Sequence, residues 1–183
     1  MGKIMVWTRQ HKSVAKILEK EDRYTAKKEI VINNEEVKLQ IHAYNWLMRA
    51  HPDLKNKPED ADFPVWVSFQ REGTMLLAPD TVILELEVDE KLLTQLDVIK
   101  WTKVNNLSYI PADINDMKRH KELLAAYGVS DAKACMSRFY PEIKREIEES
   151  WDRVFDDNVK SESGHCYGLL WEIKKEWIKS IKE

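Results

Sequence analysis

The chain has 183 residues, 43% of them hydrophobic, which is enough for one domain with a substantial core. Its 29 basic and 32 acidic residues give a formal net charge of −3, which argues against a protein whose whole surface is built to bind nucleic acid. The distant cysteines, Cys135 and Cys166, indicate free thiols in a reducing compartment. We see no signal peptide and no apolar run of the ~20 residues that a membrane span needs, so we expect a cytoplasmic protein that does not contact a membrane.

The first predicted element is a short strand over residues 3–8, in which Ile4 and Val6 alternate with Met5 and Trp7. A helix follows and ends near Asp22. Its first apolar residues come directly after Ser13, and serine is a preferred residue at the start of a helix. We therefore predict that Ser13 caps this helix.

A longer helix is predicted over residues 35–50, with Asn34 as its cap and Glu35 and Glu36 in its first turn. Apolar residues cover most of its circumference and leave a narrow polar wedge that contains His42 and Arg49. A helix of this kind is packed on more than one side. We expect it to lie against the sheet.

Two further strands are predicted over residues 65–70 and 81–88. The second alternates regularly, so that Leu84 and Leu86 face the core while Glu85 and Glu87 face away from it. A slip of one residue would bury both glutamates, so the register should be strongly specified. Because the two strands are consecutive, we predict that they pair as a hairpin.

The second half of the chain is predicted to be mainly helical. Helices are expected over residues 97–106, from Asp113 to Gly128, after Ser130 and from Pro141. The closing segment is ambiguous, and its aromatic and β-branched residues favour a strand over residues 167–174. The predicted architecture is α+β, with a small, mostly antiparallel sheet and helices packed against it in one compact domain of residues 1–183.

Common catalytic and binding motifs do not occur in this sequence. The five histidines show no spacing typical of a metal site, and we interpret His120, on an apolar helix face, as a hydrogen-bonded core residue. Neither a nucleophile elbow nor a glycine-rich phosphate loop is present. The closely spaced Glu85 and Glu87 could raise the pKa of one of the two carboxyls and so supply a general acid or base, although a solvated strand face is the far commoner origin of such a pair.

The sequence resembles a bacterial family of small proteins that is catalogued as a domain of unknown function, number three-eight-four-one. The resemblance rests on the opening Val6 to Gln10, on Phe63 to Trp66, on Leu86 to Val88 and on Leu170 to Ile173. It covers nearly the whole chain. It implies no established activity.

A more distant resemblance is to the ADP-ribosyltransferase superfamily, whose members open with a strand that contacts NAD and carry a catalytic glutamate on a late strand. Trp7, Thr8, Arg9 and Gln10 followed by a helix and Tyr24 are similar to that opening, and Glu172 is similar to the late glutamate. The resemblance implies that Glu172 and Arg9 are catalytic, that Trp7, Thr8, Gln10, Tyr24 and Trp66 bind the cofactor NAD, and that no metal takes part. The sequence departs from the superfamily because its first strand has no histidine.

Two other function classes fit the same residues. One is a non-catalytic module similar to PUA-like folds, in which Trp7, Trp66 and Trp171 form a stacking platform for RNA or a modified base. The other is a protein that binds a protein partner and has no small-molecule site. For the enzyme similar to ADP-ribosyltransferases and for the PUA-like module, the predicted partner is therefore a small nucleotide or a nucleic acid. For the protein that binds a protein partner, the identity of that partner is undefined.

Overall fold

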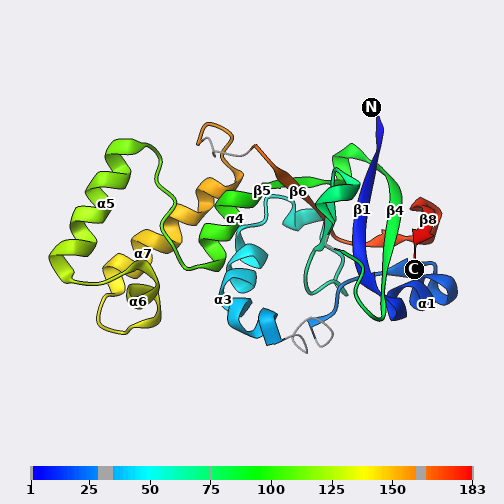
Figure 1. The fold of residues 1–183 in the computed structure, drawn as a ribbon, viewed down its shortest axis with the longest axis horizontal. Coiled ribbons are helices and arrows are strands. Elements are labelled where there is room, and N and C mark those ends of the chain that lie inside the picture. The colour runs from blue at the N-terminus through cyan, green and yellow to red at the C-terminus, as the bar shows by residue number, and fades with distance from the viewer. Residues whose placement is uncertain (1, 29–34, 75, 160–163, 183) are drawn as a thin grey trace.

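The computed structural model describes residues 2–28, 35–74, 76–159 and 164–182, and it confirms the predicted α+β architecture (Figure 1). Its strands are β1 (Lys3–His11), β2 (Arg23–Tyr24), β3 (Val65–Ser68), β4 (Thr81–Asp89), β5 (Thr94–Asp97), β6 (Cys166–Leu170), β7 (Ile173–Lys174) and β8 (Ile178–Lys182). Six of them form an antiparallel sheet in the order β5-β6-β3-β1-β4-β8. The remaining two, β2 and β7, pair with each other.

The pairing of β1 with β4 is the longest in the sheet. Its register runs without interruption from Lys3 opposite Asp89 to His11 opposite Thr81. The alternation predicted for β4 is confirmed, because Leu84 and Leu86 are fully buried whereas the glutamates between and after them are partly exposed.

The helices are α1 (Lys12–Glu21), α3 (Glu35–Ala50), α4 (Val98–Asn105), α5 (Ile114–Tyr127), α6 (Asp131–Met136) and α7 (Pro141–Ser150). Figure 1 shows α5, α6 and α7 gathered at one end of the molecule, with β1 and β4 at the other. Helix α3 lies between these two regions, and it packs on both of them as predicted. Ile41 and Met48 contact the core of the sheet, and Trp46 and Leu47 belong to the core of the helices. Among the described residues, none of the helices has the length and apolar character to cross a membrane.

The predicted hairpin of residues 65–70 with residues 81–88 is wrong. Strand β1 lies between β3 and β4 and pairs with both of them. Strand β3 also ends earlier than predicted, because the Ser68 hydroxyl donates to the Gln70 carbonyl and accepts from the Gln70 N–H, which turns the chain away from the sheet.

The predicted strand over residues 167–174 is divided between two sheets. Strand β6 pairs with β3 and β5, the chain leaves the large sheet at Trp171 and Glu172, and β7 then pairs with β2. The break occurs where the Trp171 indole turns into the core and donates to the Asp53 carbonyl at 3.1 Å. The edge strands β5 and β8 were not predicted.

The predicted helix ends are largely confirmed. Asp113 accepts from two N–H groups of α5, Gly128 ends that helix with a positive φ, Ser130 caps α6, and Pro141 occupies the first turn of α7. The cap predicted for α1 is wrong, since His11 takes that position and its Nδ1 accepts from the Ser13 N–H at 3.2 Å. The cap predicted at Asn34 lies outside the described residues.

Candidate functional site

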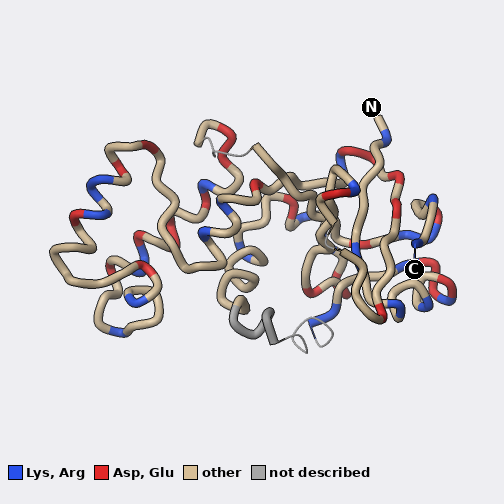
Figure 2. Tube along the Cα trace, viewed as in Figure 1, with Lys and Arg blue, Asp and Glu red and all other residues tan. Residues whose placement is uncertain are grey.

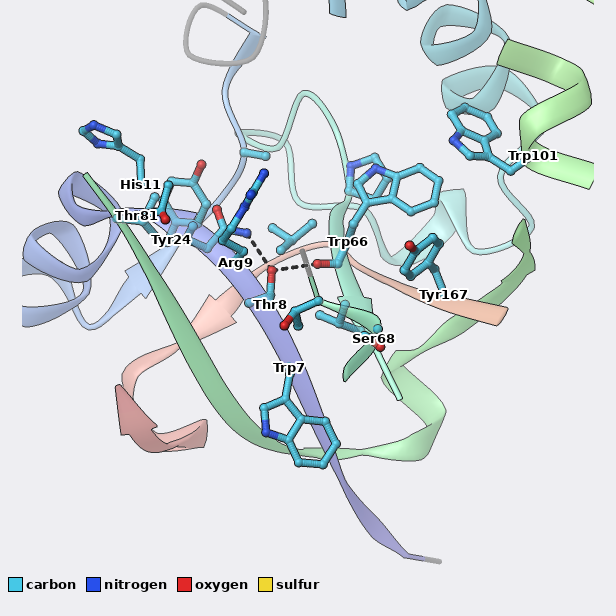
Figure 3. A pocket seen from close by; sticks show the side chains of 18 of the residues that line it. Trp7, Thr8, Arg9, His11, Tyr24, Trp66, Ser68, Thr81, Trp101 and Tyr167 are labelled. Carbon is cyan, nitrogen blue, oxygen red and sulfur yellow. Dashed lines mark hydrogen bonds between the residues drawn. The ribbon is translucent and has the colours of Figure 1, made fainter. Parts of the chain in front are cut away.

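The large sheet opens between β1 and β3. Among the described residues, the register of these two strands consists of the single pair Trp7 opposite Ser68, and beyond it the strands diverge. The Thr8 hydroxyl spans the opening and donates to the Trp66 carbonyl at 2.7 Å, while Gln10 Nε2 donates to Thr8 Oγ1 at 2.8 Å (Figure 3). Side chains therefore replace the backbone ladder at this point, and a cleft takes the place of continuous sheet.

The cleft has a volume of about 510 Å³. Residues 7–11 of β1 and residues 64–68 around β3 form its two long sides. The remaining lining comes from α1, β2 and the segment after it, α3, the loop after β3, β4, α4 and β6, through Val14, Tyr24, Ala26, Tyr44, Gly73, Thr74, Thr81, Trp101 and Tyr167. A volume of this size lies within the range of small-molecule sites.

One end of the cleft is aromatic. The Trp66 ring lies 5.0 Å from the Trp101 ring and 5.9 Å from the Tyr167 ring, between ring centres, and Tyr44 contacts both tryptophans edge to face. These four rings come from β3, α4, β6 and α3, and Figure 3 shows three of them along one side of the cleft. They form a rigid apolar wall against which a flat ring could pack.

Trp66 also contributes a polar atom at this end. Its Nε1 is buried and makes no hydrogen bond of normal geometry within the described part of the chain. Burial raises the pKa of the nearby Tyr44 hydroxyl. The Trp66 N–H acts in the opposite direction and lowers that pKa, but its effect is the smaller of the two. A buried N–H without an acceptor is costly, and a bound acceptor would remove that cost.

The other end of the cleft is polar and carries Arg9, His11 and Thr81 (Figure 3). Arg9 donates from Nη1 to the Leu76 carbonyl at 2.9 Å, which connects β1 to the loop after β3. Gly73 of this loop approaches β3 so closely that a Cβ atom there would lie 2.3 Å from Ser68 Oγ. A larger residue at position 73 would therefore displace the Ser68 side chain.

The described residues that line the cleft include no aspartate, glutamate, lysine or cysteine. Its ionisable groups are Arg9, His11 and tyrosines, and burial raises the pKa of Tyr24. Within the described ranges, no three histidine, cysteine, aspartate or glutamate side chains come together as a metal site. The arrangement is suited to holding a flat polar molecule, and it offers no carboxylate for acid–base chemistry.

The structure brings together six of the seven residues predicted from the sequence. Trp7, Thr8, Arg9, Gln10, Tyr24 and Trp66 all line the cleft. Trp7 differs from the others, because its indole points away from the group formed by Thr8, Trp66 and Tyr167 (Figure 3).

Glu172, the seventh predicted residue, is not among the residues that line the cleft. We expected Arg9 or Gln10 as its partner, but its Oε2 instead lies 2.5 Å from Nε of Arg23, and Lys174 Nζ lies 3.5 Å from its Oε1. Its side chain is 22% exposed. The different partner follows from the pairing of β2 with β7, which places Arg23 opposite Lys174 and beside Glu172.

The predicted platform of Trp7, Trp66 and Trp171 does not assemble. Trp171 is buried against His51, with ring centres 4.4 Å apart, and does not line the cleft. Sequence reasoning assigned no site role to Tyr44, Trp101 and Tyr167, which do line it. These residues lie on three elements that are far apart in the sequence, so no motif spacing could have linked them.

Comparison with family models places the chain in one family. A model described as Domain of unknown function (DUF3841) matches residues 5–179, and the chain belongs to this family. No matching protein was found among curated proteins, and none was found among solved structures. The comparisons give no support to the resemblance to ADP-ribosyltransferases.

Proposed function

We propose that the cleft between β1 and β3 binds a nucleotide through the flat ring of its base or nicotinamide group, and that NAD is the first ligand to test. The observation that carries this proposal is the opening of the sheet onto the aromatic wall formed by Trp66, Trp101, Tyr167 and Tyr44. Where the ladder between β1 and β3 breaks, backbone N–H and C=O groups lose their strand partners. A ligand that supplies donors and acceptors would pair with these groups.

The aromatic end fits a heterocyclic ring in two respects. Stacking of a base on an aromatic side chain contributes ~1–3 kcal/mol and tolerates different bases. The buried Trp66 N–H can donate to a ring nitrogen or to a carboxamide oxygen, an interaction that a plain hydrocarbon could not accept.

The polar end fits the phosphate group of the same ligand. The planar Arg9 guanidinium is suited to phosphate oxygens, and His11 adds a second nitrogen donor nearby (Figure 3). Elsewhere in the described chain, acidic and basic residues are interspersed, so the positive charge at the cleft is a local feature (Figure 2). This charge favours a single nucleotide over a long nucleic acid strand.

The lining supports binding more directly than it supports group transfer. Transfer of ADP-ribose would require a carboxylate next to the ribose, and the described lining residues provide none. Glu172, the carboxylate that the sequence suggested, is engaged by Arg23. We therefore propose a nucleotide-binding protein, and treat release of nicotinamide as an outcome to be measured.

The experiment is titration calorimetry with NAD, AMP and nicotinamide, using the wild-type protein and two matched tryptophan variants. Trp66→Phe removes the buried N–H from the cleft, whereas Trp177→Phe changes a tryptophan that does not line it. We expect at least one probe to bind wild type and Trp177→Phe alike, and Trp66→Phe to bind roughly tenfold more weakly.

Dissociation constants above ~1 mM for all three probes would overturn the proposal. Equal binding by Trp66→Phe and wild type would show that the ligand lies elsewhere. Incubation with NAD followed by chromatography separates binding from catalysis, because released nicotinamide would show that the protein also cleaves the cofactor.

A further inference from the structure

We infer that Glu172 is a positioning residue for the cleft, and that it acts by holding Arg23 so that Tyr24 stays in the cleft wall. The inference rests on the proposed nucleotide site. It gives the glutamate a role in ligand binding without contact with the ligand.

The wall of the cleft at Tyr24 has little backbone support. The register of β2 with β7 consists of Arg23 opposite Lys174 and Tyr24 opposite Ile173, and the Lys175 N–H donates to the Asp22 carbonyl at 2.9 Å. Two residues beyond Tyr24, the Ala26 carbonyl accepts from the N–H groups of Asp62 and Phe63. A two-stranded sheet is marginally stable by itself even when it is longer than this. Side chains must therefore contribute to holding β2 in place.

Arg23 supplies this support by joining three segments. Its Nε lies 2.5 Å from Glu172 Oε2, and its Nη2 lies 2.5 Å from Asp60 Oδ1. Glu172 belongs to the crossing from β6 to β7, and Asp60 belongs to the loop before β3. The guanidinium thus connects β2 to both neighbouring segments through charge-assisted hydrogen bonds.

Asp60 is itself fixed by further donors. The Thr25 hydroxyl lies 3.1 Å from Asp60 Oδ2, and the Lys27 ammonium contacts the same carboxylate. Burial acts to raise the pKa of Asp60, but the hydrogen bonds from Lys27, Arg23 and Thr25 outweigh it and bring the pKa down to about 2. The carboxylate therefore stays charged and continues to hold Arg23 at neutral pH.

Tyr24 transmits this arrangement to the ligand site. It is 5% exposed, packs in the core of the sheet, and lines both the cleft and a smaller cavity of about 270 Å³ on the side of Arg23 and Asp60. Its strand partner Ile173 is the residue next to Glu172. A displacement of the Glu172 segment would thus move Tyr24 through one strand pair.

The charge of Glu172 matters because cations surround it. Arg23 and Lys174 both contact its carboxylate. Replacement by glutamine keeps the size of the side chain but removes the charge that Arg23 and Lys174 share, and it leaves Asp60 as the remaining carboxylate paired with Arg23. We expect β2 and β7 to separate in this variant while the β1–β4 pairing remains intact.

The test compares Glu172→Gln with Glu176→Gln, which removes the same charge from a nearby exposed glutamate outside the pair. Both changes are made in the wild-type and Tyr24→Ala backgrounds, and NAD, AMP and nicotinamide binding are measured by calorimetry. We expect Glu172→Gln to weaken binding roughly tenfold in the wild-type background and to have little further effect in Tyr24→Ala, because residues that act through one another are not additive. Glu172→Asp, which keeps the charge, should restore part of the affinity.

Three results would overturn the inference. If Glu172→Gln binds as wild type does, the pair does not position the cleft. If its effect is equally large in both Tyr24 backgrounds, Glu172 acts by another route. If wild type binds none of the probes, the proposed function fails as well, and hydrogen exchange then shows whether Glu172→Gln still loosens β2, which would leave it a purely structural residue.

Discussion

The cleft and the helical end of the molecule differ in how their buried polar groups are hydrogen-bonded. In the cleft, the Trp66 N–H is buried and finds no acceptor of normal geometry among the described residues, and a sheet ladder is interrupted. At the helical end, His120 is 3% exposed, yet both of its ring nitrogens contact carboxylates: Nδ1 lies 2.9 Å from Glu146 and Nε2 lies 2.7 Å from Asp131. This confirms the interpretation of His120 as a hydrogen-bonded core residue.

The network around His120 extends through Tyr109, whose ring stacks on the imidazole at 3.9 Å between ring centres. The Tyr109 hydroxyl donates to Asp116, which also accepts from the Ala112 N–H and pairs with Arg119 and Arg153. A network in which each polar group is hydrogen-bonded makes a fold more rigid. A buried polar group without a hydrogen-bond partner can instead bind a ligand that supplies one. The difference separates a structural cluster from a candidate site.

The largest expected effect tests the apolar core that supports the cleft. Leu84 is fully buried in β4, so Leu84→Ala should lower the free energy of unfolding by ~2–5 kcal/mol. Denaturation in urea measures it. Glu85→Ala, one residue away on the partly exposed face, is the matched control and should cost far less. A larger cost for Glu85→Ala would contradict the register of β4.

The next effect concerns His51, a buried histidine whose Nε2 has no hydrogen-bond partner among the residues that the structure describes. Burial against Trp171 and Phe155 lowers its pKa to about 4, which outweighs the opposite effect of Asp53. As the pH falls, His51 is therefore protonated near pH 6.5 in the unfolded chain but only near pH 4 in the folded protein. Stability should fall by roughly 3 kcal/mol as the pH drops through this window.

The control for this pH effect is His51→Asn, which does not titrate but retains an acceptor for the Asp53 N–H that His51 Nδ1 now binds. Thermal denaturation between pH 7 and pH 4 should show a flatter profile for the variant. The same slope in both proteins would assign the pH dependence to another group.

A somewhat smaller effect is expected at Asp116. Burial acts to raise the pKa of this carboxyl, but hydrogen bonds from Ala112, Arg119 and Tyr109 together with the charge of Arg153 bring it down to about 2. Asp116→Ala should cost ~2 kcal/mol, and the wild type should lose the same contribution as the pH falls from about 4 towards 2. Glu122→Ala, an exposed change on the same helix, should leave the urea midpoint unchanged.

The smallest effect on stability is expected at Trp66. Because the part of the chain that the structure describes offers its N–H no acceptor of normal geometry, Trp66→Phe gives up ring area but also removes a buried unsatisfied donor, so the net change should stay below ~1 kcal/mol. A loss as large as that of Asp116→Ala would show that the N–H is satisfied in solution. The buried polar groups of the cleft would then be hydrogen-bonded, as those of the network around His120 are.

Local signals in the sequence predicted local structure well. The alternation around Leu84, the cap at Asp113 and the helix end at Gly128 each depend on neighbouring residues, and all were correct. Strand order was not predictable in this way, because the insertion of β1 between β3 and β4 depends on packing across the whole chain. The contact between Arg23 and Glu172 joins residues 149 positions apart, so it left no local pattern to read.

The same contrast has a consequence for how the chain folds. The sheet is built almost wholly from distant pairs, such as Val65 with Leu170 and Ile83 with Lys182, and closing such long loops slows folding. The contacts of His120 with Asp131 and Glu146 are far closer in sequence. We expect the helical end to acquire its structure first, and the cleft, whose two sides come from β1 and β3, to be among the last parts of the molecule to form.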